Sequence, residues 1–172
     1  MMKKIHKIGL SLLIFFFCTG FDRITKDFAQ KTLSVSPPIS MLNDSLRIQY
    51  SENIGGMLGI GENLPSQLRI VLFIILVGMV LTAVVVYAIK VRDLNLSQFV
   101  GLLLLVSGGI GNLIDRLINN GAGIDFMNIG IGSLRTGIFN FADVFIMAGV
   151  SIFVVASMKK EPKSEIHSLQ RE

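Results

Sequence analysis

Long stretches of apolar residues alternate with shorter polar segments along this chain. No charged side chain occurs between Ile70 and Ile89, and none occurs between Leu94 and Ile114. Runs of about 18 or more uncharged, mostly apolar residues are typical of membrane-spanning helices. The pattern predicts an integral membrane protein with spanning helices at about residues 7–28, 68–89, 94–117 and 139–158.

A polar segment at about residues 30–67 separates the first two predicted spans. It contains Pro37-Pro38 and several serines, which are typical of a loop outside the membrane. Within it, Leu46 to Tyr50 alternates apolar and polar side chains, the period of a half-exposed strand. The stretch from Asn53 to Gly59 contains glycines that allow a close backbone approach. We therefore expect a small extramembrane unit with β-structure here.

The N-terminal stretch is similar to a secretory signal, because a basic start is followed by an apolar run that ends at Cys18. Three phenylalanines precede Cys18, where cleavage requires small residues, so we expect an uncleaved first helix. Asp22 and Lys26 stand four residues apart near its far end and can pair. The pair is either an ordinary surface contact or part of a site, and the sequence leaves both interpretations open.

The basic residues predict how the chain is oriented. They gather in the N-terminal tail, in the short turn around Lys90 and in the polar tail at residues 159–172. In a protein with four spans these segments share one side, and the positive-inside rule makes it the cytoplasmic side. Residues 1–158 are expected to form one membrane domain with the segments 30–67 and 118–137 facing outward.

Composition argues against several other classes of protein. The net charge of +4 is scattered and is explained by lysines that flank the spans, which gives no reason to expect a nucleic-acid partner. Cys18 is the single cysteine, so no disulfide can form within the chain. His6 and His167 lie in the tails without neighbours spaced as metal ligands. We expect neither a metal nor another cofactor.

Polar residues gather at the outward end of the third span. Gly108, with two more glycines close by, removes side-chain bulk and permits a close helix contact. Asn112, Asp115 and Arg116 follow at helical spacing, which places polar atoms on one side of the last turns. Arg116 is expected to bind a carboxylate through two parallel N–H groups. Charge at the edge of a hydrocarbon layer is costly, so this cluster indicates either a site or a structural tie.

Two further carboxylates suggest a reaction. Asn140 and Asp143 stand three residues apart at the start of the fourth span, and Asp125 lies in the preceding loop, which we expect to be free to move toward Asp143. Two neighbouring carboxyl groups can share one proton, which lets one activate water while the other polarises a carbonyl group. A cysteine mechanism has less support, because Cys18 has no histidine near it in the sequence.

At this point the chain resembles the lipoprotein signal peptidases, also called signal peptidase II. The similar segments, which follow in the family's order, are residues 22–26, 53–59, 108–116, 124–126 and 139–143. The resemblance implies an all-α membrane protein, a four-transmembrane-helix bundle with a small extramembrane β-cradle at about residues 30–67. It also implies a monomer in the bacterial inner membrane, in contact with lipid, with both termini cytoplasmic and the active site near the outer face.

The resemblance further implies an aspartic endopeptidase that needs no cofactor. Its substrates would be prolipoproteins, cut immediately before a cysteine that carries a diacylglyceryl group. Carried over residue by residue, Asp125 and Asp143 are the catalytic pair. The residues that would support the pair or bind substrate are Asn112, Arg116, Asn140, Asn53, Asp22, Lys26, Gly108 and Asp115.

Some positions depart from the family pattern. Arg23 stands where the family usually has glutamine, and Gly56-Met57-Leu58 stands where Ala-Ala-Phe is common. We expect Asp115 to have a structural role beside Arg116, and Arg135 to have only a surface role. Two other interpretations stay open: a non-catalytic protein whose polar cluster ties helices together, and a transporter with a proton-relay carboxylate pair.

Overall fold

The computed structural model describes residues 4–56, 60–91 and 93–158. The predicted polar tail at residues 159–172, and Met57, Leu58 and Gly59 of the glycine-rich segment, lie outside these residues. Four helical segments in the described part are long and apolar enough to cross a membrane. They are α1 (Lys4–Leu33), the continuous run of α2 (Ser66–Ile70), η2 (Val71–Leu76) and α3 (Val77–Lys90), then α4 (Leu96–Ile118) and α5 (Phe141–Met158). The predicted helical membrane architecture is confirmed.

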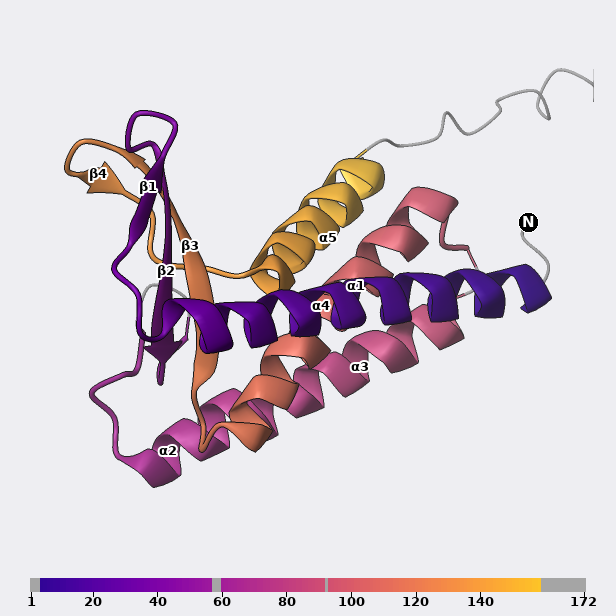
Figure 1. Cartoon of the computed structure of the whole chain (residues 1–172). Helices are drawn as coiled ribbons and strands as arrows, with labels where there is room; N and C mark the ends of the chain where they lie inside the picture. Colours follow the sequence, from indigo (N-terminus) through magenta and orange to yellow (C-terminus); the bar gives the residue numbers. More distant parts are fainter. Residues whose placement is uncertain (1–3, 57–59, 92, 159–172) are drawn as a thin grey trace, which may run out of the picture.

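The helices lie side by side, and a small sheet stands across one end of the bundle, with the N-terminus at the opposite end (Figure 1). The first span is longer than predicted, since α1 continues to Leu33 instead of ending near residue 28. Its last turns pack against the sheet. Ala29 and Leu33 form a buried apolar cluster with Phe126 of the sheet. This cluster joins the bundle to the extramembrane unit.

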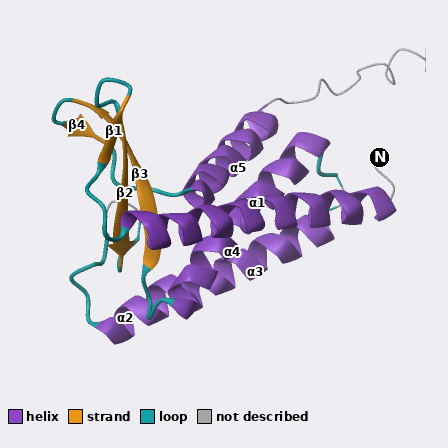
Figure 2. Ribbon diagram, in the orientation of Figure 1, coloured by secondary structure: helices purple, strands orange, loops and turns teal. Residues whose placement is uncertain are grey.

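The sheet has four antiparallel strands in the order β1-β2-β3-β4 (Figure 2). Their bounds are β1 Ile39–Met41, β2 Leu46–Asn53, β3 Gly123–Ile131 and β4 Leu134–Arg135. The strand predicted from residue 46 is present as the first part of β2. Two of these strands, β1 and β2, come from the predicted cradle segment at about residues 30–67, and β3 and β4 come from the second outward segment, where no strand was predicted. Within the sheet, β3 pairs directly with β2.

Close packing of α4 on α5 depends on glycine. A Cβ atom on Gly108 would lie 2.4 Å from the carbonyl oxygen of Ala142, and one on Gly149 would lie 2.5 Å from that of Gly101. Such distances leave no room for a side chain, so the two backbones touch directly. At its other end α4 begins with a capping box, in which the Asn95 side chain and Gln98 bond reciprocally. The glycine contact at Gly108 lets the start of α5 pack against the outward half of α4.

Candidate active site

Asp125 and Asp143 meet at the end of the bundle that the sheet covers. Asp125 belongs to β3 and Asp143 to the first turn of α5. Asn140 bonds to both: its Nδ2 donates to Asp125 Oδ1 at 2.7 Å, and its backbone N–H donates to Asp143 Oδ2 at 3.1 Å. The two carboxylates predicted from the sequence are therefore brought together around a single residue.

The position of Asp143 follows from the way α5 begins. Asn140 precedes the helix, and its Oδ1 accepts a hydrogen bond from the Asp143 backbone at 3.0 Å, while Asp143 Oδ2 accepts one from the Asn140 backbone. This reciprocal pair is a capping box formed by Asn and Asp. The three-residue spacing read from the sequence thus serves both the helix and the site.

Asp125 is held in place on both sides. Asn53 lies diagonally across from it in β2 and donates to Asp125 Oδ2 at 2.9 Å, while Asn140 binds the other oxygen. The expectation that Asp125 belongs to a mobile loop was wrong, since β3 pairing fixes its backbone. Burial raises the pKa of Asp125 to about 6; the hydrogen bonds from Asn53 and Asn140 oppose this rise, and the charge of Asp143 adds to it.

Asn112 connects the carboxylates to the interior of the bundle. Its Nδ2 donates to Asp143 Oδ1 at 2.8 Å. Its Oδ1 accepts from Asn140 Nδ2 at 3.0 Å and from Lys26 Nζ at 3.0 Å. The amide therefore links α1, α4 and α5 in one hydrogen-bond network.

A buried ion cluster lies behind this network. Lys26 Nζ is 2.7 Å from Asp22 Oδ2 and 2.7 Å from Asp115 Oδ2, and the three side chains are between 0% and 2% exposed. Asp22 Oδ1 also accepts from the backbone of Ala142 at 2.8 Å. The pairing of Asp22 with Lys26 is thus no surface contact. Lys26 lies at the centre of the polar network, in contact with Asp22, Asp115 and Asn112.

Asp115 is paired differently from the expectation. It binds Lys26 and also Arg23, whose Nη1 is 2.8 Å from Asp115 Oδ1. A partnership with Arg116 was wrong, because consecutive helix residues point about 100° apart. Asp115 faces α1, whereas Arg116 faces the loop that follows β2. The sequence did not show Arg23 as a partner of Asp115; its four-residue spacing to Asp27, which it also binds, was visible there.

Arg116 binds backbone carbonyl groups in place of a carboxylate. Its Nη1 donates to the Asn112 carbonyl at 3.0 Å, and its Nη2 donates to the Gly55 carbonyl at 2.7 Å. No carboxylate forms an ion pair with it in the part of the chain described, so the expected two-point carboxylate bond is absent. Phe73 of the π-helical turn lies against its guanidinium group, 5.6 Å from the ring centroid. Arg116 therefore holds the loop after β2 onto α4.

Glycines allow these groups to approach α4. A Cβ atom on Gly111 would lie 2.8 Å from Asp22 Oδ2, and Gly108 lets α5 approach in the same region.

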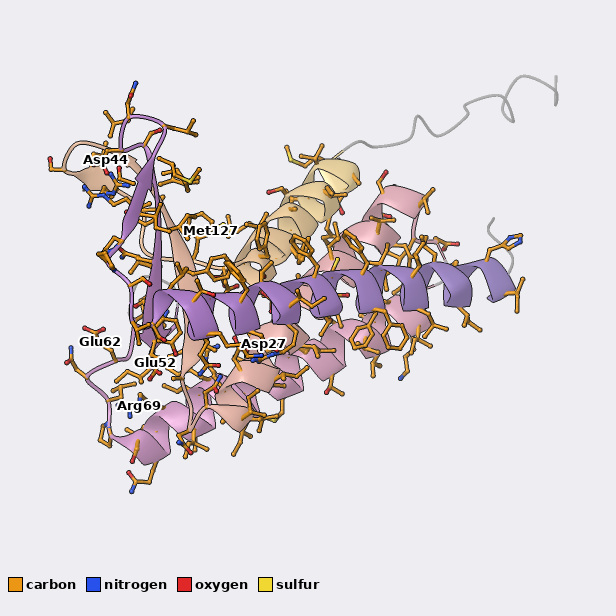
Figure 3. All side chains as sticks on the ribbon, viewed as in Figure 1. Asp27, Asp44, Glu52, Glu62, Arg69 and Met127 are labelled. Carbon is orange, nitrogen blue, oxygen red and sulfur yellow. The ribbon has the colours of Figure 1, made fainter. Side chains whose placement is uncertain are left out.

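Arg135 lies away from the site, at the tip of the sheet, where Asp44 is labelled in Figure 3. It donates to the Asp44 carbonyl at 2.8 Å and binds Asn128, and its side chain is 12% exposed. A purely surface role for Arg135 was therefore wrong, since it ties strands together.

Three cavities adjoin the two carboxylates. A polar one of about 330 Å³ is lined by Asp125, Asn53, Glu52 and Glu62, the last two labelled in Figure 3. Two mainly apolar ones share Asp143 and Met147 in their linings: one measures about 510 Å³, and the other, which also includes Arg116, about 290 Å³. The site is thus open toward both polar and apolar surroundings.

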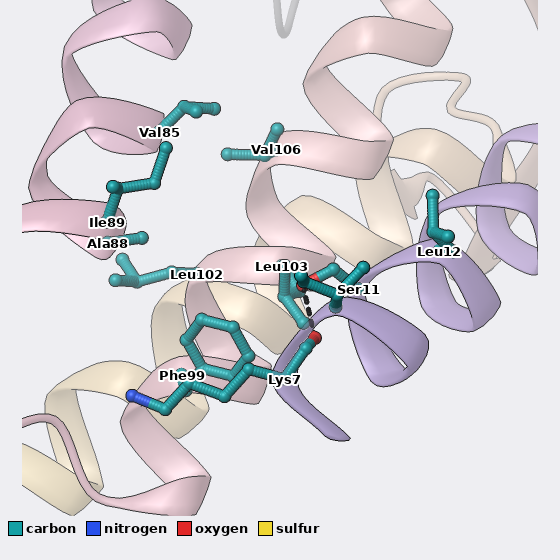
Figure 4. Close-up of a pocket in the computed structure, with 11 residues that line it drawn as sticks. Lys7, Ser11, Leu12, Val85, Ala88, Ile89, Phe99, Leu102, Leu103 and Val106 are labelled. Carbon is teal, nitrogen blue, oxygen red and sulfur yellow. Dashed lines mark hydrogen bonds between the residues drawn. The ribbon is translucent and has the colours of Figure 1, made fainter. Parts of the chain in front are cut away.

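A further apolar cavity of about 410 Å³ lies between α1, α3 and α4 at the other end of the bundle (Figure 4). Among the described residues that line it, Lys7 is the one with a charge, and its Nζ is 5.3 Å from the centroid of the Phe99 ring. The lining has no carboxylate from the described part of the chain. Among the described residues, no three His, Cys, Asp or Glu side chains come together as ligands of a metal ion.

The family model and the individual proteins that this chain resembles agree with one another. Residues 14–159 match the family described as signal peptidase (SPase) II. A lipoprotein signal peptidase of Staphylococcus aureus (strain JH9) is 32% identical over 158 residues, covering 92% of this chain and 93% of that protein. One of Borrelia hermsii is 30% identical over 159 residues, covering 90% of this chain and 92% of that protein.

Solved structures give the same result. Two structures described as bacterial membrane enzymes, obtained by the in meso method, are similar to this fold with TM-scores of 0.77 and 0.76. They are 31% and 30% identical to this chain, cover 90% of it in both cases, and are themselves covered to 93% and 96%. The likeness therefore extends over bundle and sheet together.

Proposed function

This chain belongs to the signal peptidase II family, and we propose that it works as an aspartic endopeptidase whose catalytic residues are Asp125 and Asp143. Membership makes it a protease and a multi-pass bacterial membrane protein, and the resemblance read from the sequence is confirmed. The observation that carries the catalytic proposal is the pair of hydrogen bonds from Asn140, one to each carboxylate.

Asp143 acts as the base and Asp125 as the acid. Burial raises the pKa of Asp125 to about 6, which favours a proton on this group and makes it the acid. Asp143, which accepts hydrogen bonds from Asn112 and Asn140, is then left as the base. Asp143 takes a proton from water as the oxygen attacks the scissile carbonyl carbon. Asp125 donates its proton to the carbonyl oxygen, so that a neutral tetrahedral intermediate forms.

Collapse of the intermediate restores both groups. The C–N bond breaks, the leaving amine takes the proton held by Asp143, and Asp125 recovers its proton from the hydroxyl group. Each carboxyl group ends in the state in which it began. Every step uses the two carboxyl groups and one water molecule, and no covalent enzyme intermediate forms.

The substrate is a prolipoprotein cut immediately before a diacylglyceryl-modified cysteine. Such a substrate has an apolar signal segment, apolar acyl chains and a polar mature chain, all meeting at the cleaved bond. The cavities beside the carboxylates match this description, since two are mainly apolar and one is polar. We assign the mature chain to the polar cavity lined by Glu52 and Glu62, and the apolar parts to the other two.

The site faces the outer side of the inner membrane, and the protein works as a monomer surrounded by lipid, with both termini in the cytoplasm. Supporting this orientation, Lys7 and Lys90 lie near the bundle end away from the sheet. Residues 1–158 act as one peptidase domain, and the tail at residues 159–172 lies outside it. The supporting residues are Asn112, Arg116, Asn140, Asn53, Asp22, Lys26, Gly108 and Asp115.

The test is cleavage of a diacylglyceryl-modified precursor by the purified protein in detergent or lipid. Asp125→Asn and Asp143→Asn should each lower turnover by about 10²- to 10⁴-fold, because each removes an acid–base group. Asp93→Asn is the matched control, since it makes the same change in the exposed turn at the other end of the bundle, and it should retain wild-type turnover.

All variants should insert and accumulate like the wild type, as judged by membrane fractionation. Near wild-type turnover in either catalytic variant would remove the assignment of Asp125 and Asp143. Absence of cleavage by the wild type would favour the non-catalytic interpretation, in which the polar cluster only ties the helices together.

A further inference from the structure

Lys26 has no direct contact with either proposed catalytic carboxylate, yet it is fully buried beside them. Its ammonium group can donate three hydrogen bonds and accept none. The three are used by Asp22 and Asp115, each at 2.7 Å, and by Asn112 Oδ1 at 3.0 Å. An ion pair alone would need only the carboxylates. The bond to the neutral amide is therefore the contact that requires an explanation.

The bond from Lys26 fixes which way the Asn112 amide faces. Because the ammonium group only donates, Asn112 must turn its oxygen toward Lys26, and its Nδ2 then points at Asp143 Oδ1 at 2.8 Å. The reversed amide would place its NH₂ group against an ammonium group and its oxygen against a carboxylate. Lys26 thus excludes the orientation in which Asp143 loses its donor.

The orientation of the Asn112 amide also fixes the orientation of the Asn140 amide. Asn112 Oδ1 also accepts a hydrogen bond from Asn140 Nδ2 at 3.0 Å. The NH₂ group of Asn140 must therefore lie on the side that faces Asp125, where it donates to Asp125 Oδ1 at 2.7 Å. The oxygen of Asn140 then faces the backbone N–H of Asp143 at 3.0 Å. One buried cation therefore sets the direction of two amides and supplies each carboxylate with an N–H donor.

We propose that Lys26 is a positioning residue of the active site, which acts on Asp143 and Asp125 through the amides of Asn112 and Asn140. This inference rests on the proposed aspartic peptidase function. It gives the ion cluster a role in turnover in addition to its role in holding α1 against α4. Substrate binding should depend little on Lys26, since the side chain is 0% exposed and lines none of the cavities beside the carboxylates.

The test removes Lys26 without leaving an unbalanced charge. Lys26→Met alone would leave Asp22 as a buried unpaired anion, whereas Asp115 would keep its ion pair with Arg23, so the variant of choice is Lys26→Met combined with Asp22→Asn, which keeps the net charge of the cluster. This double variant should lose kcat by about 10²-fold with KM within about twofold of wild type, because geometry and not binding is disturbed.

Arg23→Gln is the matched control for a merely structural role. Arg23 binds the same Asp115 carboxylate but makes no hydrogen bond to Asn112. This variant should keep kcat, even where the melting temperature of the purified protein falls. Lys26→Arg retains a donor and should recover part of the kcat that the Lys26→Met variant loses.

A double-mutant cycle with Asn112→Ala decides whether Lys26 acts through the amide. If it does, the combined Lys26→Met and Asp22→Asn change should reduce kcat much less in the Asn112→Ala background than in the wild type. Full additivity, unchanged kcat in a folded Lys26 variant, or an equal loss in Arg23→Gln would each overturn the inference. If the wild type cleaves and depends on Asp125 and Asp143 while the cycle is additive, only this inference fails. Absence of wild-type cleavage would instead defeat the proposed function.

Discussion

Neutral amides, and not cations, make the side-chain hydrogen bonds to Asp125 and Asp143. Asn53 and Asn140 donate to Asp125, and Asn112 donates to Asp143. A carboxylate in direct contact with a cation stays ionised, whereas an amide donor leaves room for a bound proton. The cations Lys26 and Arg116 are held one step away, on Asn112 and on backbone carbonyls. This separation suits a pair of carboxyl groups that must share one proton.

The pH dependence of cleavage follows from Asp125. Its pKa is raised to about 6, so the group is protonated below that pH and ionised above it. The proposed acid is lost on ionisation, and kcat/KM, which reports the free enzyme, should fall by up to tenfold per pH unit above about pH 6. A kcat/KM that rises from pH 6 to pH 8 would contradict this assignment of the acid.

Asn53→Ala provides the internal control for this profile. The Asn53 hydrogen bond lowers the pKa of Asp125, so its removal should move the descending limb of kcat/KM to higher pH.

Within the sequence, the spacing of Asn140 and Asp143 was sufficient to predict a helix start that carries a carboxylate. The partner of Asp115 was not predictable, because it depends on which neighbouring helix packs against that side of α4.

At the level of elements, the contact of α4 with α5 sets the position of the site. Glycines along α4 were visible in the sequence and predicted close helix contact, and the structure adds which backbone atoms touch. The strand β3 was not predicted, because the apolar–polar alternation from Ile124 to Phe126 shifts by one residue at Met127, and the segment was interpreted as a loop. The half-exposed β2 shows that alternation and was predicted. Asp125 was paired with Asp143 from the gathering of carboxylates and from the family resemblance, but its place on a strand was not predicted.

Gly108→Ala and Gly149→Ala distinguish the effect of the α4–α5 contact on catalysis from its effect on protein stability. Each new Cβ atom would lie 2.4 to 2.5 Å from a backbone oxygen, so each should destabilise the protein by about 1–3 kcal/mol, measured as a lower melting temperature. Only Gly108 faces Ala142, next to Asp143, so Gly108→Ala should also lower kcat of the folded protein by at least tenfold. Gly149→Ala should retain kcat.

Gly20→Ala serves as the neutral control for both variants. A Cβ atom at Gly20 would meet nothing within 4 Å, so melting temperature and kcat should both be retained. Equal kcat in Gly108→Ala and Gly149→Ala would contradict the view that the contact beside Ala142 positions Asp143.

For the whole molecule, the polar cluster, the sheet and the two carboxylates share one end of the bundle, whereas Lys7 and Lys90 lie toward the other. The apolar runs were enough to predict the four spans, and the direction in which the spans cross the membrane stays a prediction from the flanking charges. The relative arrangement of the helices was not predictable, since every apolar surface can pack against any other. The polar contacts between α1 and α4 supply the missing specificity.

Thiol labelling tests the proposed orientation. With the buried Cys18 changed to alanine, Leu42→Cys at the exposed sheet tip should react with a membrane-impermeant maleimide in intact spheroplasts. Asp93→Cys, in the exposed turn at the opposite end, should react only after the membrane is permeabilised. The reverse labelling pattern would invert the proposed topology without affecting the reaction chemistry.

The location of one carboxylate on the sheet and the other on α5 has a consequence for biogenesis. A nascent chain that has delivered its first three spans to the membrane already carries Asp22, Lys26 and Asp115, so the ion cluster can assemble. Asp143 belongs to the fourth span and reaches its place only when α5 inserts. If Asp125 and Asp143 form the catalytic pair as proposed, proteolytic competence arrives at a late stage of synthesis, and an incomplete chain in the bilayer cannot cleave its neighbours.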